Sequence, residues 1–217
     1  MIRKPAPAEE EGSDKLKWVS NRYQLREVLG EGGTGTVYKA HDLFLDTPVA
    51  IKVLNSDLTF DKAAIATLKE EARIAMRLAH QHIVHLHNLE KSGINYFLVM
   101  EYIEGETFRD LLQKHGRLSL ESLVQIVEVC SDAISYAHRQ KVLHNDLKPE
   151  NLLLNNEGVL KIIDFGISCL INTKQEGYIM GTPDYMSPEQ IRGETLDVRT
   201  DEYSMAVIMY ELLSGKS

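Results

Sequence analysis

Alternating hydrophobic and polar residues mark the first hundred positions of the chain. The alternating runs cover 23–29, 36–40, 48–54, 83–89 and 95–102. Glycine, aspartate and threonine fill the gaps between the first three runs, as in strands joined by hairpins. Between the third and fourth runs, apolar residues recur every three or four positions from Asp61 to Ala79. This spacing predicts one amphipathic helix among the strands.

Helical periodicity replaces the alternation after Gly105. One apolar stripe with helical spacing runs over 123–140, and the last segment, 201–214, is apolar on all sides. A helix of the second kind belongs in the middle of a domain. Short strands are predicted over 142–144, 152–154 and 160–163.

Together these patterns divide the chain into three parts. Residues 1–22 are rich in proline, alanine and glutamate and predict a flexible leader. Residues 23–103 predict a small β-rich lobe with one helix, and residues 104–217 predict a mainly helical lobe. The fold class expected from the sequence is therefore α+β with two lobes.

Composition narrows the class of protein. Of the 217 residues, 43% are hydrophobic and 26% are charged, which is ordinary globular usage. A formal net charge of −8 argues against binding nucleic acid through a broad basic surface. Two cysteines cannot form a disulfide scaffold, and no run of 18 apolar residues could cross a membrane. We therefore expect a cytoplasmic protein with neither a nucleic-acid nor a membrane partner.

A glycine-rich segment carries the first chemical motif. The letters GEGGTGTV over 30–37 satisfy G-x-G-x-x-G-x-V, and glycine lets backbone N–H groups approach phosphate closely. Dinucleotide-binding Rossmann folds share the first part of this motif, but there the glycines open a helix. The residues that follow here alternate and predict a strand. The letters VAIK over 49–52 then place Lys52 on the next strand, where its ammonium group can meet phosphate oxygens.

Three further motifs follow in order and complete a pattern. The letters HNDLKPEN cover 144–151, DFG covers 164–166 and SPE covers 187–189. With these ordered motifs the chain resembles the protein kinase family from about Leu29 to Gly215. The stretch over 181–190 is most similar to the serine/threonine kinases of bacteria. The resemblance implies a two-lobed kinase-like fold that uses ATP and Mg²⁺ and acts on protein substrates.

The resemblance implies how ATP would be held. Lys52 would contact the α- and β-phosphates and be fixed by the carboxylate of Glu71 on the predicted helix. The residues expected to contact ATP are Leu29, Gly30, Glu31, Gly32, Gly33, Thr34, Gly35, Thr36, Val37, Ala50, Lys52, Met100, Glu101, Ile103 and Leu153.

It also implies the residues that act on the transferred group. Asp146 would accept the proton of the substrate hydroxyl, and Lys148 would neutralise the γ-phosphate. Asn151 and Asp164 would hold Mg²⁺. Thr182, together with Lys148, indicates serine or threonine as the acceptor.

Two departures from the family pattern qualify the expectation. Asn145 stands where the family has an arginine that pairs with a phosphate, so we expect regulation that does not depend on that pair. The sequence ends just after the helix predicted over 201–214, so we expect an incomplete helical lobe in which a further segment or a partner chain covers that helix.

The predicted function is ATP-dependent phosphorylation of protein serine or threonine, including residues of the chain itself. The alternative is a non-catalytic kinase-like module that binds nucleotide or a partner. The retained Lys52, Asp146, Asn151 and Asp164 argue against the alternative, whereas the incomplete helical lobe argues for it. A Rossmann-type oxidoreductase is a third, weaker alternative. Four histidines over 80–87 suggest a zinc site, but no cysteine lies nearby and we expect a solvated strand face instead.

Overall fold

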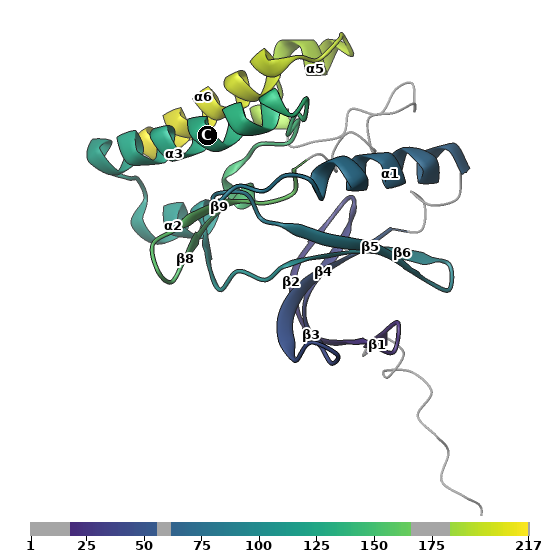
Figure 1. Cartoon of the computed structure of the whole chain (residues 1–217). Coiled ribbons are helices and arrows are strands. Elements are labelled where there is room, and N and C mark those ends of the chain that lie inside the picture. Colours follow the sequence, from purple (N-terminus) through teal and green to yellow (C-terminus); the bar gives the residue numbers. More distant parts are fainter. Residues whose placement is uncertain (1–17, 56–61, 166–182, 217) are drawn as a thin grey trace, which may run out of the picture.

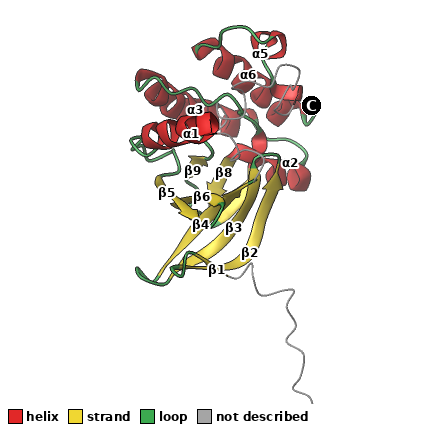
Figure 2. Cartoon of the chain, turned by 90° about the vertical axis from the view of Figure 1, so that its right-hand side faces the viewer, coloured by secondary structure: helices red, strands yellow, loops and turns green. Residues whose placement is uncertain are grey.

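The chain folds into a strand-rich lobe and a helix-rich lobe, described by a computed structural model over residues 18–55, 62–165 and 183–216. Figure 2 shows the strands of the first lobe at one end of the molecule and the helices of the second at the other. The first lobe is an antiparallel sheet of six strands in the order β1-β2-β3-β4-β6-β5. Its strands are β1 (Trp18–Val19), β2 (Tyr23–Gly32), β3 (Gly35–Asp42), β4 (Thr47–Leu54), β5 (Leu86–Ser92) and β6 (Asn95–Glu101).

Alternation along β4 divides its side chains between two small cores. Val49 and Ile51 pack with residues of β2, β3 and β6 on one face of the sheet. Ala50 and Leu54 pack on the other face against helix α1 (Lys62–Ala75), which lies across the sheet in Figure 1. Because successive side chains of a strand point to opposite faces, Lys52 shares the α1 face. The alternation along β4 therefore places Lys52 on the face of the sheet that α1 covers.

Helices α3 (Leu120–Arg139) and α6 (Val198–Ser214) form the centre of the second lobe and lie alongside each other in Figure 1. The remaining elements are β7 (Gly105–Thr107), α2 (Phe108–His115), η2 (Pro149–Asn151), β8 (Leu152–Asn155), β9 (Leu160–Ile162), η3 (Pro183–Tyr185) and α5 (Pro188–Arg192). Capping boxes at Thr107 and Ser187 satisfy backbone N–H groups at the starts of α2 and α5. Within the described residues, no helix is long and apolar enough to span a bilayer.

One side of α6 is packed and the other is exposed. Met205, Ile208 and Leu212 lie in the core of the second lobe. Tyr210 and Leu213 on the outer side keep 64% and 42% of their surface exposed. The helix predicted to be apolar all round therefore has an apolar outer face, and its cover by another segment or chain stays a prediction.

The strand predicted over 142–144 is wrong. These residues are irregular because the backbone N–H of His144 donates to the carboxylate of Asp201 at 2.9 Å. A side chain of α6 thus takes the hydrogen bond that a neighbouring strand would have accepted.

Two predicted boundaries also shift. The helix predicted over 61–79 ends at Ala75, because the N–H groups of Arg77 and Leu78 bond to carbonyls three residues earlier and tighten the last turn. Trp18–Val19 pairs with β2, so the sheet begins inside the leader predicted over 1–22.

Candidate active site

The glycine-rich segment forms the hairpin between β2 and β3. Gly30 and Gly32 are exposed, with open space where a side chain would lie. Gly35 has a φ of +153°, and a Cβ there would lie 2.0 Å from the carbonyl oxygen of Val53. Only glycine fits that position without displacing β4. Since a strand follows the glycines, the geometry required by a Rossmann fold is absent from this hairpin.

The other predicted ATP contacts between positions 29 and 37 belong to the same hairpin. They are Leu29, Glu31, Gly33, Thr34, Thr36 and Val37. Asn55 holds the tip of the hairpin, because its Nδ2 donates to the carbonyl of Gly33 at 2.8 Å. The hairpin is therefore anchored at the end of β4.

The predicted adenine contacts come from both lobes. Ala50 and Met100 are in register on β4 and β6, and Leu153 lies half-buried on β8. Glu101 ends β6, and Ile103 lies in the short link to β7. All five residues thus lie on elements at or beside the junction of the lobes, and their contact with a nucleotide stays a prediction.

Lys52 and Asp164 join the two lobes. The Nζ of Lys52 lies 2.8 Å from Oδ2 of Asp164, and the lysine is 6% exposed. Burial raises the pKa of Asp164, but the charge and the hydrogen bond of Lys52, together with the charges of neighbours that include Lys148, outweigh burial and the net shift is downward. Asp164 also has a φ of +64°, a left-handed conformation that non-glycine residues rarely adopt. Glu71 lies half-buried on α1, and its pairing with Lys52 stays a prediction.

Asp146, Lys148 and Asn151 meet in one loop before β8. Oδ2 of Asp146 lies 2.7 Å from Nζ of Lys148, and Nδ2 of Asn151 donates to the backbone carbonyl of Asp146 at 2.7 Å. The charge of Lys148 also contributes to the lowered pKa of Asp164. The loop therefore lies within electrostatic reach of the pair that joins the lobes.

A buried carboxylate that the sequence analysis missed holds this loop in place. Asp201 of α6 is 0% exposed and accepts hydrogen bonds from the backbone N–H groups of His144 and Asn145 at 2.9 and 2.8 Å. Nε2 of His138 lies 2.7 Å from the same carboxylate. Burial raises the pKa of Asp201, but these donors outweigh burial and lower it. Its sequence signal is weak, because Arg199, Glu202 and Glu211 are charged residues of the same helix.

Asn145 adopts a left-handed conformation with a φ of +63°. Asparagine tolerates this region better than most residues, so the departure from the family pattern suits the local backbone. The carbonyl of Asn145 accepts a hydrogen bond from Nε2 of Gln190 at 2.7 Å. Gln190 belongs to α5, so the loop is tied to two helices.

Phe165 packs against the histidine of the same loop. The rings of His144 and Phe165 are 4.7 Å apart in an edge-to-face arrangement, and Nε2 of His144 lies 2.8 Å from the carbonyl oxygen of Ile163. Ala75 and Leu86 are buried in a separate cluster in the first lobe. The position of Phe165 is therefore set by packing from the second lobe.

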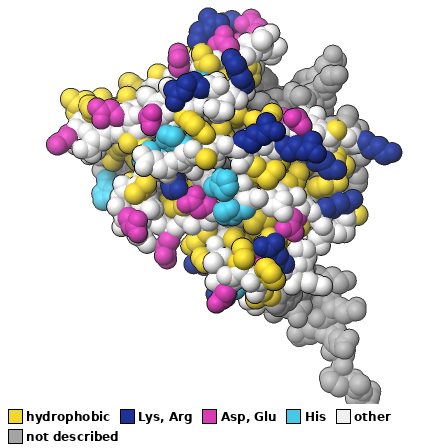
Figure 3. Space-filling view, viewed as in Figure 1, with side chains coloured by type: hydrophobic (Ala, Val, Ile, Leu, Met, Phe, Trp, Pro, Cys, Tyr) yellow, Lys and Arg dark blue, Asp and Glu magenta, His cyan; other side chains and the backbone are white. Residues whose placement is uncertain are grey.

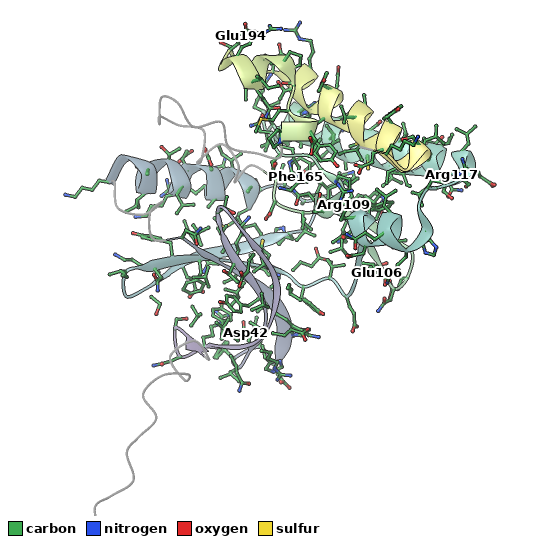
Figure 4. The ribbon with its side chains drawn as sticks, turned by 180° about the vertical axis from the view of Figure 1, so that it is seen from behind. Asp42, Glu106, Arg109, Arg117, Phe165 and Glu194 are labelled. Atoms are coloured by element: carbon green, nitrogen blue, oxygen red, sulfur yellow. The ribbon has the colours of Figure 1, made fainter. Side chains whose placement is uncertain are left out.

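Arg109 is a second residue that the sequence analysis missed. Figure 4 shows it between α2 and α6. Its guanidinium donates to Glu150 at 2.9 Å, to Glu211 at 2.6 Å and to the hydroxyl of Tyr185 at 2.5 Å. The Tyr185 hydroxyl in turn donates to Glu211. Burial lowers the pKa of Arg109, but the glutamates outweigh it and raise the pKa, so the guanidinium stays charged.

Thr182 lies outside the described residues, as does Gly166 of the DFG motif. Three of the four clustered histidines place a ring nitrogen against a carboxylate or a backbone carbonyl. His80 lies 3.1 Å from Asp132, and ring nitrogens of His82 and His85 lie 2.8 and 3.3 Å from backbone carbonyls. In the described part of the chain, no group of three or more such side chains could hold a metal ion.

Comparison with known proteins identifies the family. The protein kinase domain model matches residues 23–217. The serine/threonine-protein kinase PrkC of Bacillus subtilis is 36% identical over 203 residues, which cover 92% of this chain and 31% of that protein. The serine/threonine-protein kinase PknL of Mycobacterium tuberculosis is 38% identical over 200 residues, which cover 91% of this chain and 50% of that protein.

A solved structure has the same fold. The crystal structure of the Mycobacterium tuberculosis PknI kinase domain gives a TM-score of 0.74 at 26% identity and covers 89% of this chain and 73% of that one. The chain spans about a third of the length of PrkC, and half that of PknL. Because the family model covers nearly all of the residues after the leader, this chain belongs to the protein kinase family.

Proposed function

We propose that the chain transfers the γ-phosphoryl group of ATP to serine or threonine hydroxyls of proteins, including its own. The observation that carries this proposal is the meeting of Asp146, Lys148 and Asn151 in one loop beside the Lys52–Asp164 pair. The similarity to serine/threonine-protein kinases supports the choice of acceptor. We also propose that the lobes divide between residues 103 and 104, in the link from β6 to β7.

The residues present fit a bound Mg²⁺ and ATP. Asn151 and Asp164 offer an amide oxygen and a carboxylate, and hard oxygen donors suit Mg²⁺. Gly30 and Gly32 leave open space beside their backbone, which lets N–H groups approach phosphates. When bound, the metal neutralises charge on the phosphate oxygens.

Acidic and basic residues of the chain have different proposed roles in the transfer. Asp146 offers a carboxylate that can accept the proton of the substrate hydroxyl. Lys148 lies beside it, so a single loop can place a base and a positive charge next to the transferred group. Lys52 is held by Asp164 on the opposite lobe, and this contact fixes the distance between the two lobes at the site.

Loss of Asp146 or Lys52 tests the proposal. We expect Asp146→Asn and Lys52→Ala each to lower transfer of ³²P from ATP to casein and to the chain itself by on the order of 10²-fold or more. Phosphoamino-acid analysis of the wild-type products should give phosphoserine or phosphothreonine. The matched controls are Asp46→Asn, in an exposed turn, and Lys62→Ala, at the exposed start of α1. Wild-type transfer in both site variants would overturn the proposal.

The alternative of a non-catalytic nucleotide-binding module predicts a different pair of results. It predicts that ATP with Mg²⁺ raises the melting temperature of the chain while no phosphate is transferred. The retained base, lysine and metal-type ligands favour catalysis. Measuring the thermal shift and the transfer on one preparation distinguishes the two functions.

A further inference from the structure

A cavity outside the candidate active site lies between α1 and the β5–β6 edge of the sheet. Its volume is about 350 Å³, and its floor is apolar, formed by residues that include Ala72, Met76 and Tyr96. The residues proposed to bind ATP, to carry out transfer or to hold Mg²⁺ do not line this cavity. The cavity is therefore separate from the residues proposed to carry out phosphoryl transfer.

The rim of the cavity is basic in an acidic chain. Lys69 and Arg73 of α1 and Lys91 of β5 line it, although the whole chain carries a net charge of −8. Figure 3 shows Lys and Arg side chains gathered among hydrophobic ones on this face. Arg73 forms an exposed pair with Glu70 at 3.4 Å, a kind of pair that contributes little stability. Such a rim over an apolar floor fits an acidic segment that also carries small apolar residues.

Glu90 is the one carboxylate among the lining residues, and its charge is already engaged. Oε1 of Glu90 accepts hydrogen bonds from the hydroxyl of Tyr23 at 2.9 Å and from Nδ2 of Asn88 at 3.2 Å. Arg22 lies 4.0 Å from the same atom. The lining residues therefore carry three positive charges against one negative charge.

The leader joins the sheet beside the edge strand β5, on the face away from α1. The hydroxyl of Ser20 donates to Oε2 of Glu90 at 3.4 Å, and Glu90 is paired with Phe97 of the core on that face. The next residue, Lys91, is paired with Tyr96 of the α1 face and lines the cavity. Three consecutive glutamates, Glu9 to Glu11, precede Ser20 in the leader, and Pro7 and Ala8 come directly before them. Glu11 is nine residues from Ser20, and an extended segment of that length spans about 30 Å. Because packed layers of a fold lie only about 10 Å apart, a segment of this length is long enough to pass around the β5 edge to the rim.

We propose that the leader of the same chain docks in this cavity, with Glu9 to Glu11 at the basic rim and Pro7-Ala8 over the apolar floor. The tether favours the same chain over a second copy, because a short linker gives an effective concentration in the millimolar range. The docked leader would contact α1, the helix that carries Glu71. The proposal concerns binding and does not depend on phosphoryl transfer.

Carbodiimide cross-linking of the full chain, read by mass spectrometry, tests the docking. This reagent joins a carboxylate to a lysine amine only where the two are in contact. We expect Glu9, Glu10 or Glu11 to be joined to Lys69 or Lys91 in the monomer, with a yield that does not change on dilution. At about 0.5 M NaCl the yield should fall by about threefold or more, because the Debye length shortens to a few ångströms.

Charge reversal at the rim supplies the matched comparison. Arginine does not react with carbodiimide, so Arg73→Glu leaves both lysines available and should lower the cross-link yield about threefold or more. Arg77→Glu, an exposed residue just after α1 that does not line the cavity, should leave the yield unchanged. Equal yields in both variants would overturn the proposal. So would a yield that grows with concentration, or lysines that join other carboxylates but not the leader.

Discussion

Replacing Asp201 by asparagine tests how the loop that carries Asp146, Lys148 and Asn151 is held in place. The change keeps the shape of the side chain and removes its charge. The new side chain can still accept from the N–H of Asn145, but its NH₂ group then faces the N–H of His144 in place of a carboxylate oxygen. The variant therefore loses charge-assisted hydrogen bonds and places two donors against each other in a buried site.

The size of the effect follows from these contacts. A hydrogen bond to a charged group contributes about 1.5–3 kcal/mol, and a buried donor left without an acceptor costs about 1–3 kcal/mol. We therefore expect Asp201→Asn to lower the free energy of unfolding by about 2–5 kcal/mol. Because the folded protein lowers the pKa of Asp201, its contribution is fully present above the unfolded pKa, about 3.9, and is lost as the pH falls through the lower folded value.

Urea unfolding followed by circular dichroism at several pH values measures both effects. Wild type should lose stability as the pH falls below about 4, and the variant should show a smaller loss over that range. Glu202→Gln, the exposed neighbour on the same helix, is the matched control and should change stability by less than about 0.5 kcal/mol. A variant at Asp201 with wild-type stability and the same pH profile would refute the reasoning.

Three further predictions follow from packing and charge. Arg109→Met leaves the carboxylate of Glu211 buried without its cation and should lower the free energy of unfolding by about 3–5 kcal/mol. The double variant with Glu211→Gln should lose less stability than the sum of the two single variants, and a double-mutant cycle in urea would measure the difference. Gly35→Ala should lower the melting temperature by several degrees because its Cβ meets the β4 backbone, while Gly32→Ala, where space is open, should lower it less. Burial raises the pKa of Cys130 to about 12, so iodoacetamide at about pH 8 should label this cysteine only in the unfolded chain, as mass spectrometry of the native and urea-treated protein would show.

Local sequence patterns predicted the strands and the motif positions well. Alternation along β4 was enough to predict that Lys52 lies on a strand, and the glycine spacing was enough to predict a hairpin before it. These features depend on neighbouring residues, so their period appears in the sequence.

Local sequence patterns could not predict contacts between residues that are far apart in the chain. Asp201 binds N–H groups 56 and 57 residues away, and Arg109 reaches Glu211 across 102 residues. Neither pair leaves a local period in the sequence. The strand predicted over 142–144 failed for the same reason, because its backbone donor is taken by a side chain from α6.

Helix α6 holds the loop that carries Asp146, Lys148 and Asn151 at two places, and this affects how the second lobe unfolds. Asp201 near its start binds the beginning of the loop, and Glu211 near its end holds Arg109, which binds Glu150 at the far side of the loop. These two helical positions are ten residues, or about 15 Å, apart. Separating the loop from the helix would break both attachments, so loop and helix should unfold as one cooperative unit. In native-state hydrogen exchange, the amides of His144 and Asn145 should then exchange at the same slow rate as the middle of α6.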